Sequence, residues 1–210
     1  MTLQLTMDTK AGQILERIAV ASLEKCVAKL SRISAGEWSV ADARVSWRSM
    51  AEAIREHSGG PRGTGAAAYF EITGEYPFTS MVVFRPEDIE VISRGFLGFS
   101  FSKLPSLNQA QELLLSELGN VILNSLLGSL SNTLKRSFLP SAPKCVQGEI
   151  RYLLEALWTA TEQAGRQSLV TVILDLRCDG TVTRIEVLAL IPDNMERALI
   201  AAHDAKTDGE

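Results

Sequence analysis

The sequence predicts one pseudo-symmetric α+β domain in which two long helices pack on the same side of a continuous antiparallel sheet. Residues 8–33 and 106–138 both show the apolar spacing of long helices, and strand-like segments follow each of them. The order of elements also repeats, because the pattern at Pro86 returns at Pro192, an offset of 106 residues (192 minus 86). This internal duplication favours one shared sheet, since each half alone is too small to bury both faces of a sheet.

Length and composition agree with a single domain. The chain has 210 residues, of which 46% are hydrophobic and 22% charged, so it can bury a full core. We expect one domain over residues 1–210 that consists of two pseudo-repeats, at about 8–98 and 106–205. Two separable domains would need a linker, and no stretch rich in Pro and Ser lies near residue 100. The sequence does not distinguish a monomer from a dimer in which a sheet edge pairs with a second copy.

The first half opens with a helix for which Asp8 is a candidate N-cap. The glycine-rich stretch at 58–65 is a loop by composition, and it lacks the Gly-Lys-Ser/Thr ending of a phosphate-binding loop. A helix at 85–98 has Pro86 in its first turn, where proline is favoured. The other elements expected here are a strand at 37–47, a short helix at 49–57 and a hairpin of strands at 66–73 and 79–84.

The second half repeats this order. A capping box of Ser106 and Gln109 is expected to open its long helix, which should run to about Phe138. Asp179 and Gly180 predict a tight hairpin turn. The remaining expected elements are a strand at 143–147, a helix at 148–165, strands at 168–178 and 181–191, and a final helix at 191–203.

Charge and hydropathy argue against several classes of partner. The formal net charge of -4 gives no overall attraction to nucleic acid or to an anionic membrane surface. No stretch reaches the roughly 18 uninterrupted apolar residues of a membrane span, and the N-terminal residues lack the pattern of a signal peptide. We therefore expect a cytoplasmic protein.

Cysteine and histidine usage predicts neither a disulfide framework nor a metal site. Cys26, Cys145 and Cys178 are far apart, odd in number and set among apolar or strand-like residues, as buried thiols of a reducing compartment would be. His57 and His203 are isolated from each other and give no metal-ligand spacing.

A line of polar and small residues follows the second long helix at steps of 3, 4, 4 and 3 residues, and we call it the polar line. It contains no Lys or Arg, so a partner could approach it closely along several turns. The alternative interpretation is an ordinary solvated face. The polar line is Glu117, Asn120, Asn124, Gly128 and Ser131, and the apolar side of the helix holds Leu114, Leu118, Val121, Ile122 and Leu126.

Within this line, Glu117 and Asn120 form the only Glu-x-x-Asn of the chain, and Pro143 follows Asn120 after 22 intervening residues. This combination resembles the signature Asp/Ser-x3-Glu-x2-Asn-x22-Pro of the CheC, CheX and FliY group of chemotaxis phosphatases. The resemblance covers nearly the whole chain, including the element order of each half and the duplicated layout of CheC. It implies a CheC-like fold.

The sequence departs from this signature at two places. Leu113 stands four residues before Glu117, where the family has Asp or Ser. In the first long helix, Glu16 is kept but Ala19 stands where the matching Asn would be. The resemblance therefore implies one competent site, on the second helix, and one degenerate site at Glu16 and Ala19.

The function that the resemblance implies is dephosphorylation of a response-regulator receiver domain such as CheY. Such a receiver carries its own Mg²⁺ and Lys beside the aspartyl phosphate, so no cofactor is expected in this chain. An accelerating protein needs only to place a water in line with the departing carboxylate. Asn120 suits this role because its amide both donates and accepts hydrogen bonds, and Glu117 would pair with the receiver lysine.

A non-catalytic function of the same fold is the alternative hypothesis. The protein would then dock a receiver, a flagellar-switch component or a CheD-like protein without accelerating any reaction. Leu113 and Ala19 favour this alternative, whereas the joint presence of Glu117, Asn120 and Pro143 favours the phosphatase.

Overall fold

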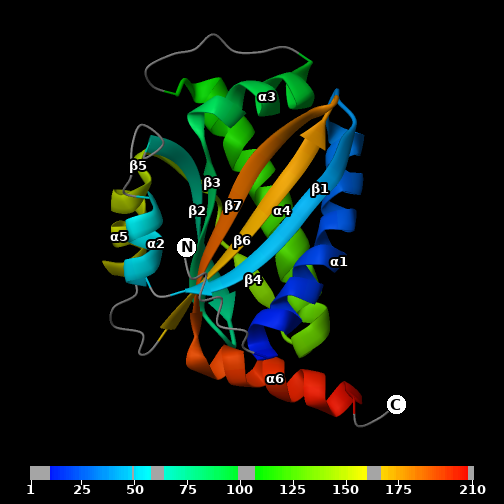
Figure 1. The fold of residues 1–210 in the computed structure, drawn as a ribbon, viewed down its shortest axis with the longest axis vertical. Helices are drawn as coiled ribbons and strands as arrows, with labels where there is room; N and C mark the ends of the chain where they lie inside the picture. Colours follow the sequence, from blue (N-terminus) through cyan, green and yellow to red (C-terminus); the bar gives the residue numbers. More distant parts are fainter. Residues whose placement is uncertain (1–9, 49, 58–63, 99–106, 160–166, 208–210) are drawn as a thin grey trace, which may run out of the picture.

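A seven-stranded antiparallel sheet runs through both halves of the chain (Figure 1). The structure is a computed structural model and describes residues 10–48, 50–57, 64–98, 107–159 and 167–207. The strand order is β1-β6-β7-β3-β2-β4, and β5 also pairs with β2. The strands are β1 (Trp38–Arg48), β2 (Thr64–Gly74), β3 (Phe78–Phe84), β4 (Phe138–Pro140), β5 (Lys144–Glu149), β6 (Gln167–Cys178) and β7 (Thr181–Pro192).

Strands of the two halves pair with each other at four places, one of which is the pairing of β2 with the short strand β4. β3 of the first half pairs with β7 of the second near the middle of the sheet, β1 pairs with β6, and β5 pairs with β2. The sheet is therefore continuous across the two halves. Together with the helices described next, it confirms the expected α+β fold class.

Helices cover the two faces of the sheet unequally. α1 and α4 pack over one face, around a core that includes Leu23, Phe70 and Leu118, and α2 and α5 cover part of the other face. α3 and α6 lie at opposite ends of the sheet (Figure 1). The described helices are α1 (Lys10–Ile33), α2 (Met50–His57), α3 (Pro86–Leu97), α4 (Gln109–Leu134), α5 (Ile150–Thr159) and α6 (Asp193–Thr207).

Several local signals act as the sequence predicts. Pro86 occupies the first turn of α3, and Gly98 ends that helix in a left-handed conformation with φ 81°. Asp179 and Gly180 both have positive φ, 47° and 84°, as a type I′ turn between β6 and β7 requires.

The limits of α4 differ from the expected ones. Its capping box is formed by Asn108 and Gln111 rather than by Ser106 and Gln109: the Asn108 side chain accepts from the Gln111 backbone N–H, and the Gln111 side chain accepts from the Asn108 N–H, both at 2.9 Å. Ser106 lies outside the described residues. The helix ends at Leu134 instead of near Phe138, because the next residue, Lys135, adopts a left-handed conformation.

Other differences concern short or partly described segments. Phe138 begins β4, a three-residue strand that was not predicted from the sequence. The helix expected at 148–165 is described as Ile150–Thr159, and the residues after it lie outside the described part. Asp8 and residues 58–63 of the glycine-rich loop also lie outside it, whereas Thr64 already belongs to β2.

Candidate functional site

The position of α4 is set by an unusually close contact with the sheet. A Cβ atom added at Gly119 would lie 2.8 Å from the Cβ of Ala68 in β2, so only glycine fits there without a shift. Leu115, Leu118 and Ile122 flank this contact and are almost completely buried. One side of α4 is therefore pressed onto the sheet, and the opposite side faces outward.

The polar line lies on the outward side of α4. Glu117 and Gly128 are exposed, and Asn120, Asn124 and Ser131 are partly buried. Apart from its chain neighbours and the adjacent helix backbone, no heavy atom of the described residues lies within 4 Å of a Cβ built at Gly128, so this part of the line is open. Most of its apolar counterpart is buried as expected, with Leu114, Leu118, Ile122 and Leu126 in the core and Val121 partly buried.

Asn120 and Asn124 are joined by hydrogen bonds. The Nδ2 of Asn124 donates to the Oδ1 of Asn120 at 2.6 Å and to its backbone carbonyl oxygen at 2.9 Å. These contacts link the two carboxamides of the polar line, which lie one helical turn apart. Helical spacing predicts both residues on the same line, and their separation of four residues is the sequence signal for this contact.

Glu117 precedes this pair by one turn, and it forms no ion pair with the described residues. Its carboxylate is exposed and available to a partner cation. Leu113, one turn earlier, is 64% exposed, so the position where the family signature has Asp or Ser presents an apolar surface here. The structure thus aligns Leu113, Glu117, Asn120 and Asn124 on successive turns of α4.

Pro143 immediately precedes β5, on the segment that joins β4 to β5. This segment is held to the edge of β2 by Ser141, whose backbone N–H donates to the Glu71 carbonyl oxygen at 2.8 Å and whose Oγ accepts from the Glu71 N–H at 3.1 Å. Pro143 is partly buried. It belongs to the strand edge of the fold, unlike the helical residues of the polar line.

The first half presents different residues from those expected. Glu16 is exposed, but Ala19 is only 1% exposed and faces the core between α1, α4 and the sheet. An offset of 100 residues superimposes all nine buried residues of α1 on buried residues of α4, whereas the offset of 101 that pairs Glu16 with Glu117 superimposes four of the nine. By burial, the residues that correspond to Glu117 and Asn120 are Arg17 and Val20, both of which are exposed.

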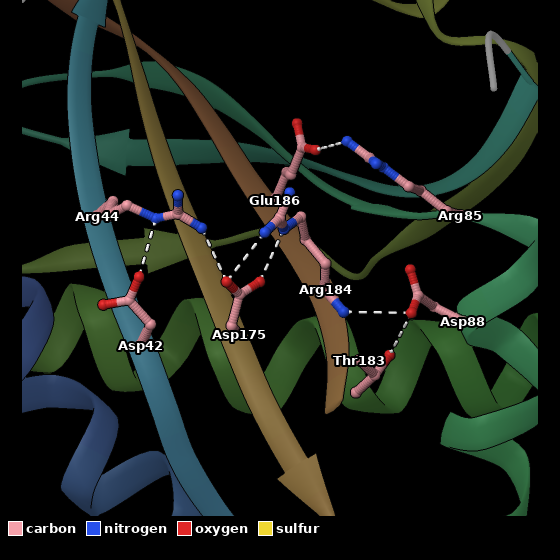
Figure 2. Close-up of polar contacts among 8 residues, drawn as sticks. All are labelled: Asp42, Arg44, Arg85, Asp88, Asp175, Thr183, Arg184 and Glu186. Atoms are coloured by element: carbon pink, nitrogen blue, oxygen red, sulfur yellow. Dashed lines mark hydrogen bonds and ion pairs between the residues drawn. The ribbon is translucent and has the colours of Figure 1, made fainter. Parts of the chain in front are cut away.

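A network of charged residues on the sheet was not predicted from the sequence (Figure 2). Asp175 on β6 accepts two hydrogen bonds from Arg184 of β7, at 2.7 and 3.0 Å, and a third from Arg44 of β1 at 2.8 Å. Arg44 also pairs with Asp42 at 3.0 Å. The network joins three strands on the face opposite α1 and α4, and no sequence pattern connects residues so far apart in the chain.

Hydrogen bonds and burial shift the pKa values of acids in and near this network. The hydrogen bond from Arg184 is the main reason that the pKa of Asp175 is lowered. Burial raises the pKa of Asp88, whose carboxylate accepts from the Thr183 hydroxyl at 3.0 Å and from the Arg184 backbone N–H at 3.2 Å. Nearby, Arg85 forms an ion pair with the buried Glu186. The contacts of Asp175 hold β1, β6 and β7 together, and those of Asp88 attach α3 to β7. These residues therefore have a structural role.

The remaining residues singled out in the sequence do not form a catalytic cluster. Burial raises the pKa of Cys26, Cys145 and Cys178 to about 11, so these thiols are protonated at neutral pH. His203 is partly buried on α6, and the side chain of His57 lies outside the described residues. Among the described residues, no group of three or more His, Cys, Asp and Glu could hold a metal ion.

By length and composition, α4 is long and apolar enough to cross a membrane, with a mean hydropathy of 1.4. In the structure, 61% of its most apolar window is buried, as in the core helix of a globular domain.

Solved structures with this fold come from chemotaxis and flagellar proteins. Thermotoga maritima FliY matches with a TM-score of 0.70 and 15% identity over 98% of this chain and 100% of that chain. A chain of the FliG–FliM complex from H. pylori has a TM-score of 0.62, with 12% identity over 92% and 99%. CheX from Desulfovibrio desulfuricans has a TM-score of 0.50, with 13% identity over 84% and 99%. These matches confirm the CheC-like fold that the sequence resemblance implies.

No protein-family model and no curated protein matches the sequence.

Proposed function

We propose that the protein is a phosphatase of a phosphorylated receiver domain in chemotaxis or two-component signalling. The observation that carries this proposal is the placement of Glu117 and Asn120 one turn apart on the outward line of α4. Between them, Gly119 brings the helix close to the sheet, and Leu118 is buried in the core. The two polar side chains are thus held on a rigid element, which suits a site that must orient a water.

Dephosphorylation of a receiver would require few chemical groups from this chain. An aspartyl phosphate in a receiver lies beside the receiver's own Mg²⁺ and lysine, which neutralise charge on the transferring phosphoryl group. The residue that this protein adds is Asn120, whose amide would hold a water in line with the acyl oxygen that departs. Orienting one water accounts for about a hundredfold in rate, which corresponds to about 2.7 kcal/mol.

Glu117 is proposed to pair with the receiver lysine. Its carboxylate is exposed and forms no ion pair with the described residues, so docking would not first have to break an existing contact. A charge pair at this position fixes the register between the two proteins and steers their encounter. Beyond Asn124, the open space at Gly128 lets the partner backbone approach the helix closely.

Docking without catalysis is the second candidate function. It is favoured by the exposed Leu113, which replaces the Asp or Ser of the family signature with an apolar contact surface. The fold shared with a chain of the FliG–FliM complex is consistent with a flagellar-switch partner, and a CheD-like protein is a further candidate. Either function fits the proposed location in the cytoplasm.

The decay rate of an acyl-phosphorylated receiver from the same organism tests the proposal. The wild-type protein should accelerate this decay, and Asn120→Ala should return it to the spontaneous rate while still binding the receiver. Ser131→Ala, on the same line about three turns away, is the matched control and should keep the full rate. Measurable binding of the receivers without acceleration of any of them would instead support the docking function.

A further inference from the structure

We propose that Asn124 is a positioning residue that fixes the orientation of the Asn120 side-chain amide. The inference rests on the proposed phosphatase function for its catalytic meaning, but its geometric content concerns this chain alone. It begins from the two hydrogen bonds between the residues, at 2.6 and 2.9 Å.

The backbone carbonyl of Asn120 determines which way the Asn124 amide faces. A carbonyl oxygen can only accept a hydrogen bond, so the side-chain atom of Asn124 that lies 2.9 Å from it must be the nitrogen. The reverse orientation would place two oxygens against each other. The orientation of the Asn124 amide therefore follows from the helix backbone itself.

The Asn124 amide in turn determines the orientation of Asn120. The same Nδ2 lies 2.6 Å from one atom of the Asn120 carboxamide, which must then be the accepting Oδ1. Because Oδ1 and Nδ2 lie on opposite sides of Cγ, the Nδ2 of Asn120 points away from Asn124. Without this contact, the amide of a partly buried Asn could rotate by half a turn at little cost.

This fixed amide presents a defined set of groups to a reacting water. Both N–H bonds of Asn120 and one lone pair on its Oδ1 stay available, and the bond accepted by Oδ1 polarises the amide toward stronger donation. A water placed by this amide has one orientation instead of two. Loss of Asn124 should therefore lower the rate of the chemical step and leave receiver docking unchanged.

The kinetic test compares Asn124→Ala with wild type in the decay of the acyl-phosphorylated receiver. We expect kcat to fall about tenfold, with KM and the affinity for a beryllofluoride-activated receiver unchanged. Asn124→Gln retains an amide donor and should recover part of the rate. An unchanged kcat, or a loss of receiver affinity that accounts for the lower rate, would overturn the inference.

A spectroscopic test separates this inference from the proposed function. In the free protein, the NMR order parameter of the Asn120 side-chain amide should be high in wild type and should fall in Asn124→Ala, whereas Ser131→Ala should not change it. If the wild-type protein accelerates no receiver, the phosphatase proposal fails, yet this measurement still decides the geometric claim. An Asn120 amide that is equally ordered in Asn124→Ala would overturn it.

Discussion

Gly119 and Ala68 are in such close contact that a Cβ at Gly119 would lie 2.8 Å from the Cβ of Ala68. This contact sets the distance between α4 and the sheet at Gly119, which lies between Glu117 and Asn120 in the sequence. The site thus depends on a glycine that takes no part in its chemistry.

Gly119→Ala should destabilise the protein by about 1–3 kcal/mol, because α4 or β2 must shift to relieve the overlap. Gly128→Ala is the matched control on the same helix: it meets open space and should stabilise the protein by about 0.5–1 kcal/mol through helix propensity. Urea unfolding of both variants measures the difference. A neutral or stabilising effect of Gly119→Ala would show that the contact with Ala68 does not require a glycine.

Asp175→Asn should lower the free energy of unfolding by about 1–2 kcal/mol at neutral pH, since it weakens charge-assisted hydrogen bonds from two arginines. The pKa of Asp175 is lowered in the folded state, so its contribution is fully present above its unfolded pKa of about 3.9 and is lost as the pH falls from there through the lower folded-state pKa. Wild type and variant should therefore converge in stability in acid.

Asp42→Asn is the control for this prediction, because the Asp42–Arg44 pair is about half exposed on both sides and should contribute about 0–1 kcal/mol. Denaturant unfolding at pH 7 and at a pH below the folded-state pKa of Asp175 checks both variants. A gap between wild type and Asp175→Asn that persists in acid would contradict the assigned cause.

Elements with a strong helical or strand period could be predicted from the sequence. Elements and contacts that depend on which strands pair, and in which register, could not. The polar line of α4 follows from helical spacing alone, so Glu117, Asn120 and Asn124 were correctly placed on one face. The three-residue strand β4 has no pattern of its own and exists because it pairs with β2. The network around Asp175 depends on the register of β1, β6 and β7, which short-range patterns do not contain.

The alignment of α1 with α4 shows that one identical residue can suggest the wrong offset between two helices. Matching Glu16 to Glu117 gave an offset of 101, because a shared Glu was the most visible feature of the two helices. Burial, which depends on the packed sheet, favours an offset of 100 and places Ala19 in the core. The surface of α1 therefore carries Arg17 and Val20, a cation and an apolar residue, at the corresponding positions.

It follows that the outward face of α1 should not contribute to the proposed reaction. Arg17→Ala and Glu16→Ala should leave the decay rate of the phosphorylated receiver unchanged, whereas Glu117→Ala should raise KM and lower kcat/KM. All three side chains are exposed, so none of these changes should affect folding strongly. A comparable loss of rate from an α1 variant would reveal a second functional surface.

The core between α1, α4 and the sheet contains an apolar cavity of about 50 Å³, and Ala189 of β7 lines it. Ala189→Val should fill part of this space and suits a strand, so we expect stabilisation by about 0.5–1.5 kcal/mol. Ala67→Val provides the contrast within the same sheet, because Ala67 is fully buried in the other core cluster and does not line the cavity. That change should cost about 1–3 kcal/mol by overpacking. Thermal unfolding of both variants checks the pair, and a destabilised Ala189→Val would mean that the cavity cannot accept two more methyl groups.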